Sequence, residues 1–161
     1  MKQEKLTHVD SAGNPQMVDV SGKTPTRRTA RAQARVQVGT AILEKIRDNE
    51  LMTKKGPVFQ TAIIAGITGA KKTSALIPMC HPLGLEDCTI TITVDGDAVV
   101  IDATAVVTAK TGVEMEALTA ATTAALTIYD MCKALSHDIV ISDVRLMEKT
   151  GGKSDFRREE K

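Results

Sequence analysis

Apolar residues alternate with polar ones from Ala30 to Val38, where Ala or Val fills every second position and Arg or Gln the positions between. A period of two is typical of a half-buried strand, although the Ala residues weaken the pattern. Two further strands are predicted at about 85–94 and 98–108, because Asp95-Gly96-Asp97 between them favours a hairpin turn. A last strand is predicted from Ile139 to Leu146. The pattern therefore indicates at least one antiparallel pair of strands.

Three segments between these strands have helical patterns. A short amphipathic helix is predicted from Thr40, its expected cap, to about Asp48, and a second helix from about Pro57 to Ala70. A long helix is predicted from Thr111 to about Leu135, and no side chain between Ala117 and Tyr129 carries a charge at neutral pH. A helix without a polar face is buried on all sides. We therefore expect it to be central or to be covered by a second subunit.

The two ends of the chain are polar. Residues 1–15 are predicted to form a mobile arm, residues 16–20 a short strand, and residues 150–161 a mobile tail. No repeat or low-complexity tract divides the chain, so residues 1–161 are predicted to form one domain. Strands and helices in mixed order, with a hairpin, predict an α+β fold around an antiparallel sheet.

Composition argues against several classes of protein. The net charge is +1 and the chain has only three aromatic residues, so a nucleic-acid-binding surface is not expected. No apolar run approaches the ~20 residues of a membrane helix, and no secretory signal pattern is present. The three cysteines show no C-x-x-C spacing, which argues against a zinc site and favours reduced thiols. These features predict a cytoplasmic protein with no metal site of its own.

A few polar residues are candidates for chemistry. Asp130 and Lys133 share a helix face, and on spacing alone a surface salt bridge is favoured over a catalytic pair. Thr111-x-x-Glu114 matches a capping box, which leaves Glu116 as the better functional candidate of the two glutamates. His81, between two prolines, suits acid–base work, phosphate contact or a structural hydrogen bond.

Lys55-Gly56 stands just before a predicted helix, where a lysine can meet a phosphate near the helix N-terminus. Neither a P-loop nor a Rossmann motif is present in the sequence.

Five segments, read together in their order along the chain, resemble one family. They are Met17-Val18-Asp19-Val20, Lys55-Gly56-x-Val58-Phe59, Ile77-Pro78-x-Cys80-His81-Pro82-Leu83, Thr111 to Leu118 (TGVEMEAL) and Tyr129-Asp130-Met131-Cys132-Lys133-Ala134. They look like the molybdenum cofactor biosynthesis protein C family, the cyclic pyranopterin monophosphate synthases. The resemblance extends from about residue 6 to residue 154.

This resemblance implies a ferredoxin-like subunit, with an antiparallel sheet and helices packed on one face, assembled as a homohexamer of three dimers. It implies a lyase that converts a cyclised dihydro-GTP, 3′,8-cyclo-7,8-dihydroguanosine 5′-triphosphate, to cyclic pyranopterin monophosphate, with release of pyrophosphate. No cofactor is required, although the triphosphate can bring Mg²⁺. Carried onto this chain, the catalytic residues are Asp130, Lys133 and Lys55. The substrate contacts are Met79, Cys80, His81, Met115, Glu116 and Arg28, which stands beside Arg27.

Other readings of the residues remain open. A ferredoxin-like domain can bind a nucleotide without chemistry, or serve as a structural or RNA-binding subunit. A phosphohydrolase that uses His81 would release phosphate or pyrophosphate from ordinary GTP.

Overall fold

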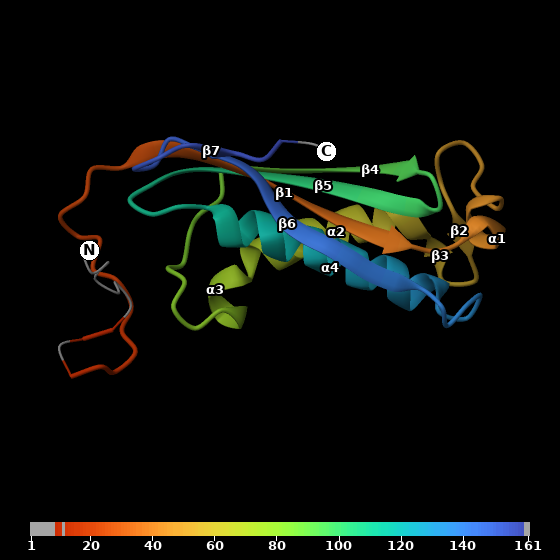
Figure 1. Cartoon of the computed structure of the whole chain (residues 1–161), viewed down its shortest axis with the longest axis horizontal. Helices are drawn as coiled ribbons and strands as arrows, with labels where there is room; N and C mark the ends of the chain where they lie inside the picture. The colour runs from red at the N-terminus through yellow and green to blue at the C-terminus, as the bar shows by residue number, and fades with distance from the viewer. Residues whose placement is uncertain (1–8, 11, 160–161) are drawn as a thin grey trace.

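A five-stranded antiparallel sheet with helices on one side forms the body of the molecule (Figure 1). The computed structural model describes residues 9–10 and 12–159. The sheet consists of β1 (Thr26–Gln37), β4 (Asp87–Asp95), β5 (Ala98–Ala109), β6 (Val140–Thr150) and β7 (Phe156–Arg157). The helices are α1 (Thr40–Leu43), α2 (Val58–Lys71), α3 (Thr73–Leu76) and α4 (Glu114–Cys132); β2 (Met52–Thr53) and β3 (Gly56–Pro57) form a separate small hairpin.

The order of the main elements along the chain is β1, α2, β4, β5, α4, β6, and the strands lie in the order β4-β5-β1-β6-β7. Two β-α-β units interleaved in this way make a ferredoxin-like fold. All strand pairs of the sheet are antiparallel. Both the α+β prediction and the ferredoxin-like arrangement with helices on one face are confirmed.

Small residues set the distance between the sheet and the helices. Ala30, Ala32 and Ala34 on β1 are fully buried, and α4 presents a buried row of alanines to the same core. The helices α2 and α4 pack closely because α2 has glycines at the contact: a Cβ on Gly66 would lie 2.9 Å from the backbone oxygen of Ala120. Bulkier side chains would push these layers apart.

The local predictions at several helix and strand ends were wrong. Gln16–Val20 forms no strand, and α1 is only four residues long, preceded by Gly39 rather than capped by Thr40. The long helix begins at Glu114, and no side chain caps its N-terminus, so the predicted capping box does not form. Part of the predicted tail is the strand β7, paired with β6. In the arm and tail, residues 1–8, 11 and 160–161 lie outside the described residues.

The long helix α4 is not buried on every side within one chain. Its alanine face is covered by the sheet and α2, but Leu126 in its middle is 56% exposed. The sequence predicted that α4 is either central in one chain or covered by a second subunit. Elements of the same chain cover it only in part. In the described part of the chain, no helix combines the length and the hydropathy needed to span a membrane.

Candidate active site

Two lysines converge on one carboxylate at the C-terminal end of α4. The Nζ atom of Lys133 lies 2.7 Å from Oδ1 of Asp130, and the Nζ atom of Lys55 lies 2.6 Å from Oδ2. Lys55 also donates to the backbone oxygen of Asp130 at 3.0 Å. That oxygen lies in the last turn of the helix, where carbonyls lack partners within the helix. The three side chains form a cluster that we call the Asp130 cluster.

The electrostatics of the Asp130 cluster follow from these contacts. Hydrogen bonds from Lys133 and Lys55 lower the pKa of Asp130 to about 2, and the Asp130 carboxylate in turn raises the pKa of Lys133. The carboxylate is therefore ionised at neutral pH. Each side chain is about half exposed, so a substrate can reach the cluster. With two ammonium groups and one carboxylate, the cluster carries a net positive charge that suits an anionic ligand.

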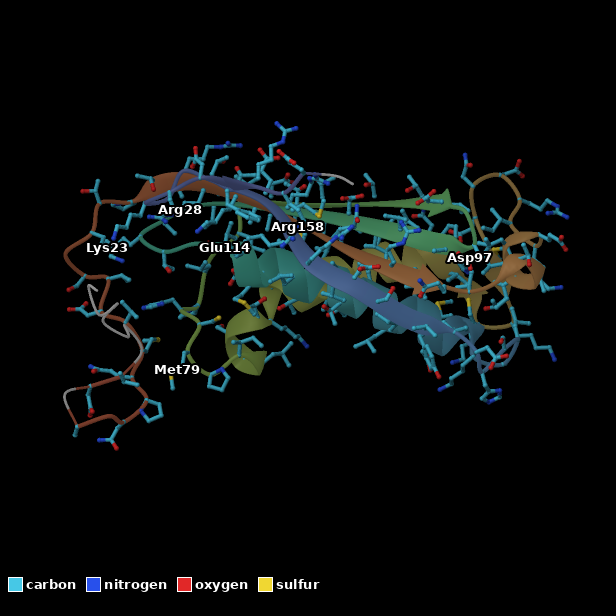
Figure 2. All side chains as sticks on the ribbon, in the orientation of Figure 1. Lys23, Arg28, Met79, Asp97, Glu114 and Arg158 are labelled. Carbon is cyan, nitrogen blue, oxygen red and sulfur yellow. The ribbon has the colours of Figure 1, made fainter. Side chains whose placement is uncertain are left out.

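The predicted substrate contacts gather in a cavity of about 480 Å³ at the other end of α4. Met79, Cys80 and His81 reach it from the loop after α3, while Met115 and Glu116 reach it from the first turn of α4. A smaller hollow of about 140 Å³, lined by Arg28, adjoins it. Figure 2 shows Met79 and Arg28 at this end of the molecule. All six predicted substrate contacts therefore line two adjoining hollows.

One chain does not bring the cavity and the Asp130 cluster together. Glu116 and Asp130 are fourteen positions apart on α4, which corresponds to about 21 Å of helix. In Figure 1 the helix extends along the molecule, so its two ends lie at opposite ends of the fold. A single small substrate cannot touch both groups in one chain.

The comparison with known proteins places the chain in one family. A sequence model of the MoaC family matches residues 17–152. The chain belongs to the MoaC family. A cyclic pyranopterin monophosphate synthase of Streptomyces avermitilis is 54% identical over 152 residues, which cover 94% of this chain and 88% of that protein. The synthase of Desulfitobacterium hafniense is 51% identical over 158 residues, 97% of this chain and 96% of that protein.

The molybdenum cofactor biosynthesis protein 1 of Drosophila melanogaster is 53% identical over 158 residues. These cover 97% of this MoaC-family chain but only 28% of the longer fly protein.

Three lysines and a glutamate at the cavity of this MoaC-family chain were missed by sequence reasoning. Glu114 lines both hollows, and its Oε1 atom lies 3.1 Å from Nζ of Lys149. Lys23 lines the larger hollow and Lys153 the smaller one. Glu114 was assigned to a capping box that does not form. For Lys23 and Lys149, the signal in the sequence was their charge, which solvated surfaces explain equally well. Lys153 stands in Gly151-Gly152-Lys153-Ser154, which resembles a phosphate-binding loop only weakly because no helix is predicted after it.

Two ionisable groups of the cavity lining, Glu116 and Cys80, are affected by burial. Glu116 is only 3% exposed, and burial raises the pKa of its carboxyl group, with a further contribution from Glu114. Burial likewise raises the pKa of the Cys80 thiol, and the charge of Glu116 adds to the effect. Both groups are therefore biased toward their protonated forms, in which the acid can donate a hydrogen bond or a proton. In the described residues no three His, Cys, Asp or Glu side chains are placed to hold a metal ion.

Glu116→Gln is expected to change how the stability of the protein depends on pH. The folded-state pKa of Glu116 is raised, so its contribution to stability is fully present below the unfolded pKa, near 4.5, and is lost as pH rises through the folded pKa. The amide does not ionise, so the variant should equal the wild type at pH 4 and exceed it in stability at pH 7.5. Urea unfolding at both pH values measures this. A variant less stable at pH 7.5 would contradict the assignment.

Proposed function

We propose that this chain is a cyclic pyranopterin monophosphate synthase, a lyase of molybdenum cofactor biosynthesis that acts on 3′,8-cyclo-7,8-dihydroguanosine 5′-triphosphate. The observation that carries the proposal is the convergence of Lys55 on Asp130 and Lys133 across 75 residues of sequence. Spacing alone favoured a simple salt bridge between Asp130 and Lys133. A third charged group brought in by the fold, in a chain about half identical to named synthases, supports a reactive cluster instead.

The Asp130 cluster suits the chemistry of this reaction. Rearranging a purine-derived ring into a pterin requires several proton transfers, which a carboxylate hydrogen-bonded to two lysines can relay. Closing the cyclic phosphate forms a P–O bond at the α-phosphorus and breaks the bond to pyrophosphate. The charge that develops on pyrophosphate needs cations, and Lys55 is proposed to supply one. Asp130 and Lys133 are proposed to move protons.

The hollows at the N-terminal end of α4 suit the binding of the substrate. Met79, Cys80, His81, Met115 and Glu116 are proposed to hold its ring system in the larger hollow, because apolar walls with a few polar groups are typical of such sites. Arg28 is proposed to contact the phosphates from the adjoining hollow, where Lys149 and Lys153 add positive charge. Mg²⁺ is proposed to enter with the triphosphate rather than on a site of the protein.

Two copies of the chain are needed to complete one site. One face of α4 is half-buried in its N-terminal part and exposed in its C-terminal part. At helical spacing it carries Met115, Thr119, Thr122, Leu126, Asp130 and Lys133. Two helices α4 packed antiparallel along this stripe bring the Met115 end of one copy to the Asp130 end of the other. A two-fold contact of this kind makes two equal sites. We propose this dimer as the unit of the hexamer, a trimer of dimers.

We also propose that the protein is located in the cytoplasm. It is supported by the three cysteines, none of which forms a disulfide in the structure. Neither nucleic acid nor a membrane has a part in the proposed reaction.

Turnover of the cyclised substrate tests the proposed function directly. The purified protein is expected to release one pyrophosphate for each 3′,8-cyclo-7,8-dihydroguanosine triphosphate consumed, with a pterin formed in equal amount. Ordinary GTP should release none, since it lacks the cyclised ring. Pyrophosphate from GTP would instead indicate the phosphohydrolase. Binding of the cyclised substrate without release of pyrophosphate would indicate a domain that only binds it.

A further inference from the structure

The carboxylate of Glu50 is bonded to both ends of the segment that carries Lys55. Its Oε1 atom accepts hydrogen bonds from the backbone N–H groups of Leu51 and Phe59, each at 2.8 Å, and its Oε2 atom accepts one from Gln60 at 3.0 Å. Leu51 precedes the β2–β3 hairpin and Phe59 follows it. One side chain therefore closes residues 51–60 into a loop with Lys55 near its middle.

Glu50 caps α2 from outside the helix. The residue before α2 is Pro57, which offers no side-chain cap, yet Phe59 and Gln60 stand at the second and third helical positions, where a cap normally accepts hydrogen bonds. Glu50 takes that role, and its negative charge is favourable at a helix N-terminus. The N-terminus of α2 and the Lys55 hairpin therefore share one anchor.

The backbone of Glu50 is itself fixed by a tight turn. Arg47 and Glu50 exchange two backbone hydrogen bonds of 2.9 Å, and the two residues between them adopt left-handed conformations, with φ of 50° for Asp48 and 59° for Asn49. At the base of the loop, beside the hydrogen bonds of Glu50, the N–H group of Val58 donates to the oxygen of the buried residue Leu51 at 2.9 Å. Glu50 is therefore held by the turn before it and by the backbone hydrogen bond that follows it.

The tip of the hairpin has weaker links of its own. The N–H group of Lys55 donates to Oγ1 of Thr53 at 3.2 Å, and the hydroxyl group of Thr53 donates to the oxygen of Gly56 at 3.3 Å. These contacts lie within the hairpin, so they do not fix its orientation relative to α4. That orientation depends on the hydrogen bonds at its base. The Nζ atom of Lys55, however, has to lie within hydrogen-bond distance of Asp130, which belongs to α4.

We propose that Glu50 is a positioning residue for Lys55, which directs the Lys55 ammonium group at Asp130 by closing the base of the hairpin. As far as catalysis is concerned, the proposal rests on the proposed function. Glu50 acts through the backbone of the loop and not on the Asp130 cluster directly. Loss of its three hydrogen bonds should let the hairpin swing and separate Lys55 from Asp130.

The placement of Lys55 is measured by chemical labelling of the purified full-length chain. Trace acetylation with acetic anhydride, followed by mass spectrometry of the peptide, gives the reactivity of Lys55 relative to its neighbour Lys54. The Nζ atom of Lys55 is hydrogen-bonded to two oxygen atoms of Asp130 and must leave them before it can react with the anhydride, so Glu50→Ala should raise the Lys55/Lys54 ratio several-fold. Glu50→Gln, which keeps one acceptor oxygen, should give a smaller increase and covers the case in which Glu50→Ala folds poorly. An unchanged ratio in both variants overturns the proposal.

Activity gives an independent second readout. Glu50→Ala should lower kcat on the order of tenfold, because the Lys55 ammonium group would lie at Asp130 for only part of the time. In a Lys55→Ala background the same change should cause no further loss, because a residue that acts through Lys55 has nothing left to position. Losses that multiply would show that Glu50 acts by another route. The matched control is Glu86→Ala, which removes a carboxylate that accepts a backbone hydrogen bond from Thr108 at 3.1 Å; both readouts should stay unchanged.

The labelling result does not depend on turnover, so it separates failure of this proposal from failure of the proposed function. If the chain releases no pyrophosphate from the cyclised substrate, the Lys55/Lys54 ratio still decides whether Glu50 places Lys55.

Discussion

Asp130→Asn is expected to lower kcat by about 10³-fold, within the range typical of the loss of a group that transfers protons. The amide has the shape of the carboxylate but no charge, and its NH₂ group turns one donor toward an ammonium group. Either Lys55 or Lys133, which now lie 2.6 and 2.7 Å from the carboxylate oxygens, therefore loses its acceptor. The measurement is steady-state release of pyrophosphate from the cyclised substrate. Circular dichroism and unfolding curves show whether the fold is retained.

A second carboxylate–cation pair of the same chain provides the control. Asp95, at the end of the edge strand β4, lies 2.9 Å from Arg35 on β1, and its side chain is 69% exposed. Exposed pairs of this kind contribute little, so Asp95→Asn should change kcat by less than about twofold. If Asp130→Asn retained activity within a few-fold of the wild type, the Asp130–Lys133 pair would be the surface salt bridge that its spacing alone suggests.

The main strands could be predicted because their patterns are local. The alternation from Ala30 to Val38 depends only on one strand lying against one core, and Asp95-Gly96-Asp97 encodes its own turn. The contact between Asp130 and Lys133 was equally local, since three positions along a helix place two side chains together. Lys55 is different, because no spacing rule links it to a residue 75 positions away. Its position before a helix suggested a phosphate contact, and only the resemblance to a family linked Lys55 to Asp130 and Lys133.

The capping-box prediction for Glu114 was wrong because a residue far away in the sequence took the place of the expected local partner. Thr111-x-x-Glu114 has the pattern of a capping box, yet the carboxylate of Glu114 pairs with Lys149 on β6 instead. Lys149 can reach it because this residue stands opposite the buried Ala30, on the side of the sheet that the helices cover. Register shifts between β1 and β6 determine that side, and a sequence pattern does not reveal such shifts.

The separation of the two predicted groups of site residues has the same physical origin. Sequence motifs identify which residues matter, but the length of α4 decides where they lie, and about 21 Å of helix separates Glu116 from Asp130. The motifs could therefore be right residue by residue and still not describe one site in one chain. The proposed second copy would resolve this, and it would also cover the apolar side chain of Leu126 that one chain leaves exposed.

Mixing two inactive variants is expected to restore activity if each site takes residues from two copies. Asp130→Asn impairs the C-terminal end of α4, and Glu116→Ala removes the carboxyl group from the cavity at its N-terminal end. In a mixed dimer one site then carries both substitutions and the other carries neither. With random pairing, half of the dimers are mixed and half of their sites are intact, so about a quarter of the wild-type activity should return. The variants are co-expressed with different affinity tags, purified and assayed for pyrophosphate release.

The control pair is Asp130→Asn mixed with Lys133→Ala, because both substitutions lie at the same end of α4. In every mixed dimer of this pair each site retains one defect, so no activity should return, which also excludes contamination by wild-type protein. If Asp130 and Glu116 instead served one site within a single chain, the first mixture would stay as inactive as the second. Since fourteen helical positions separate these two side chains along a rigid helix, we expect recovery in the first mixture alone.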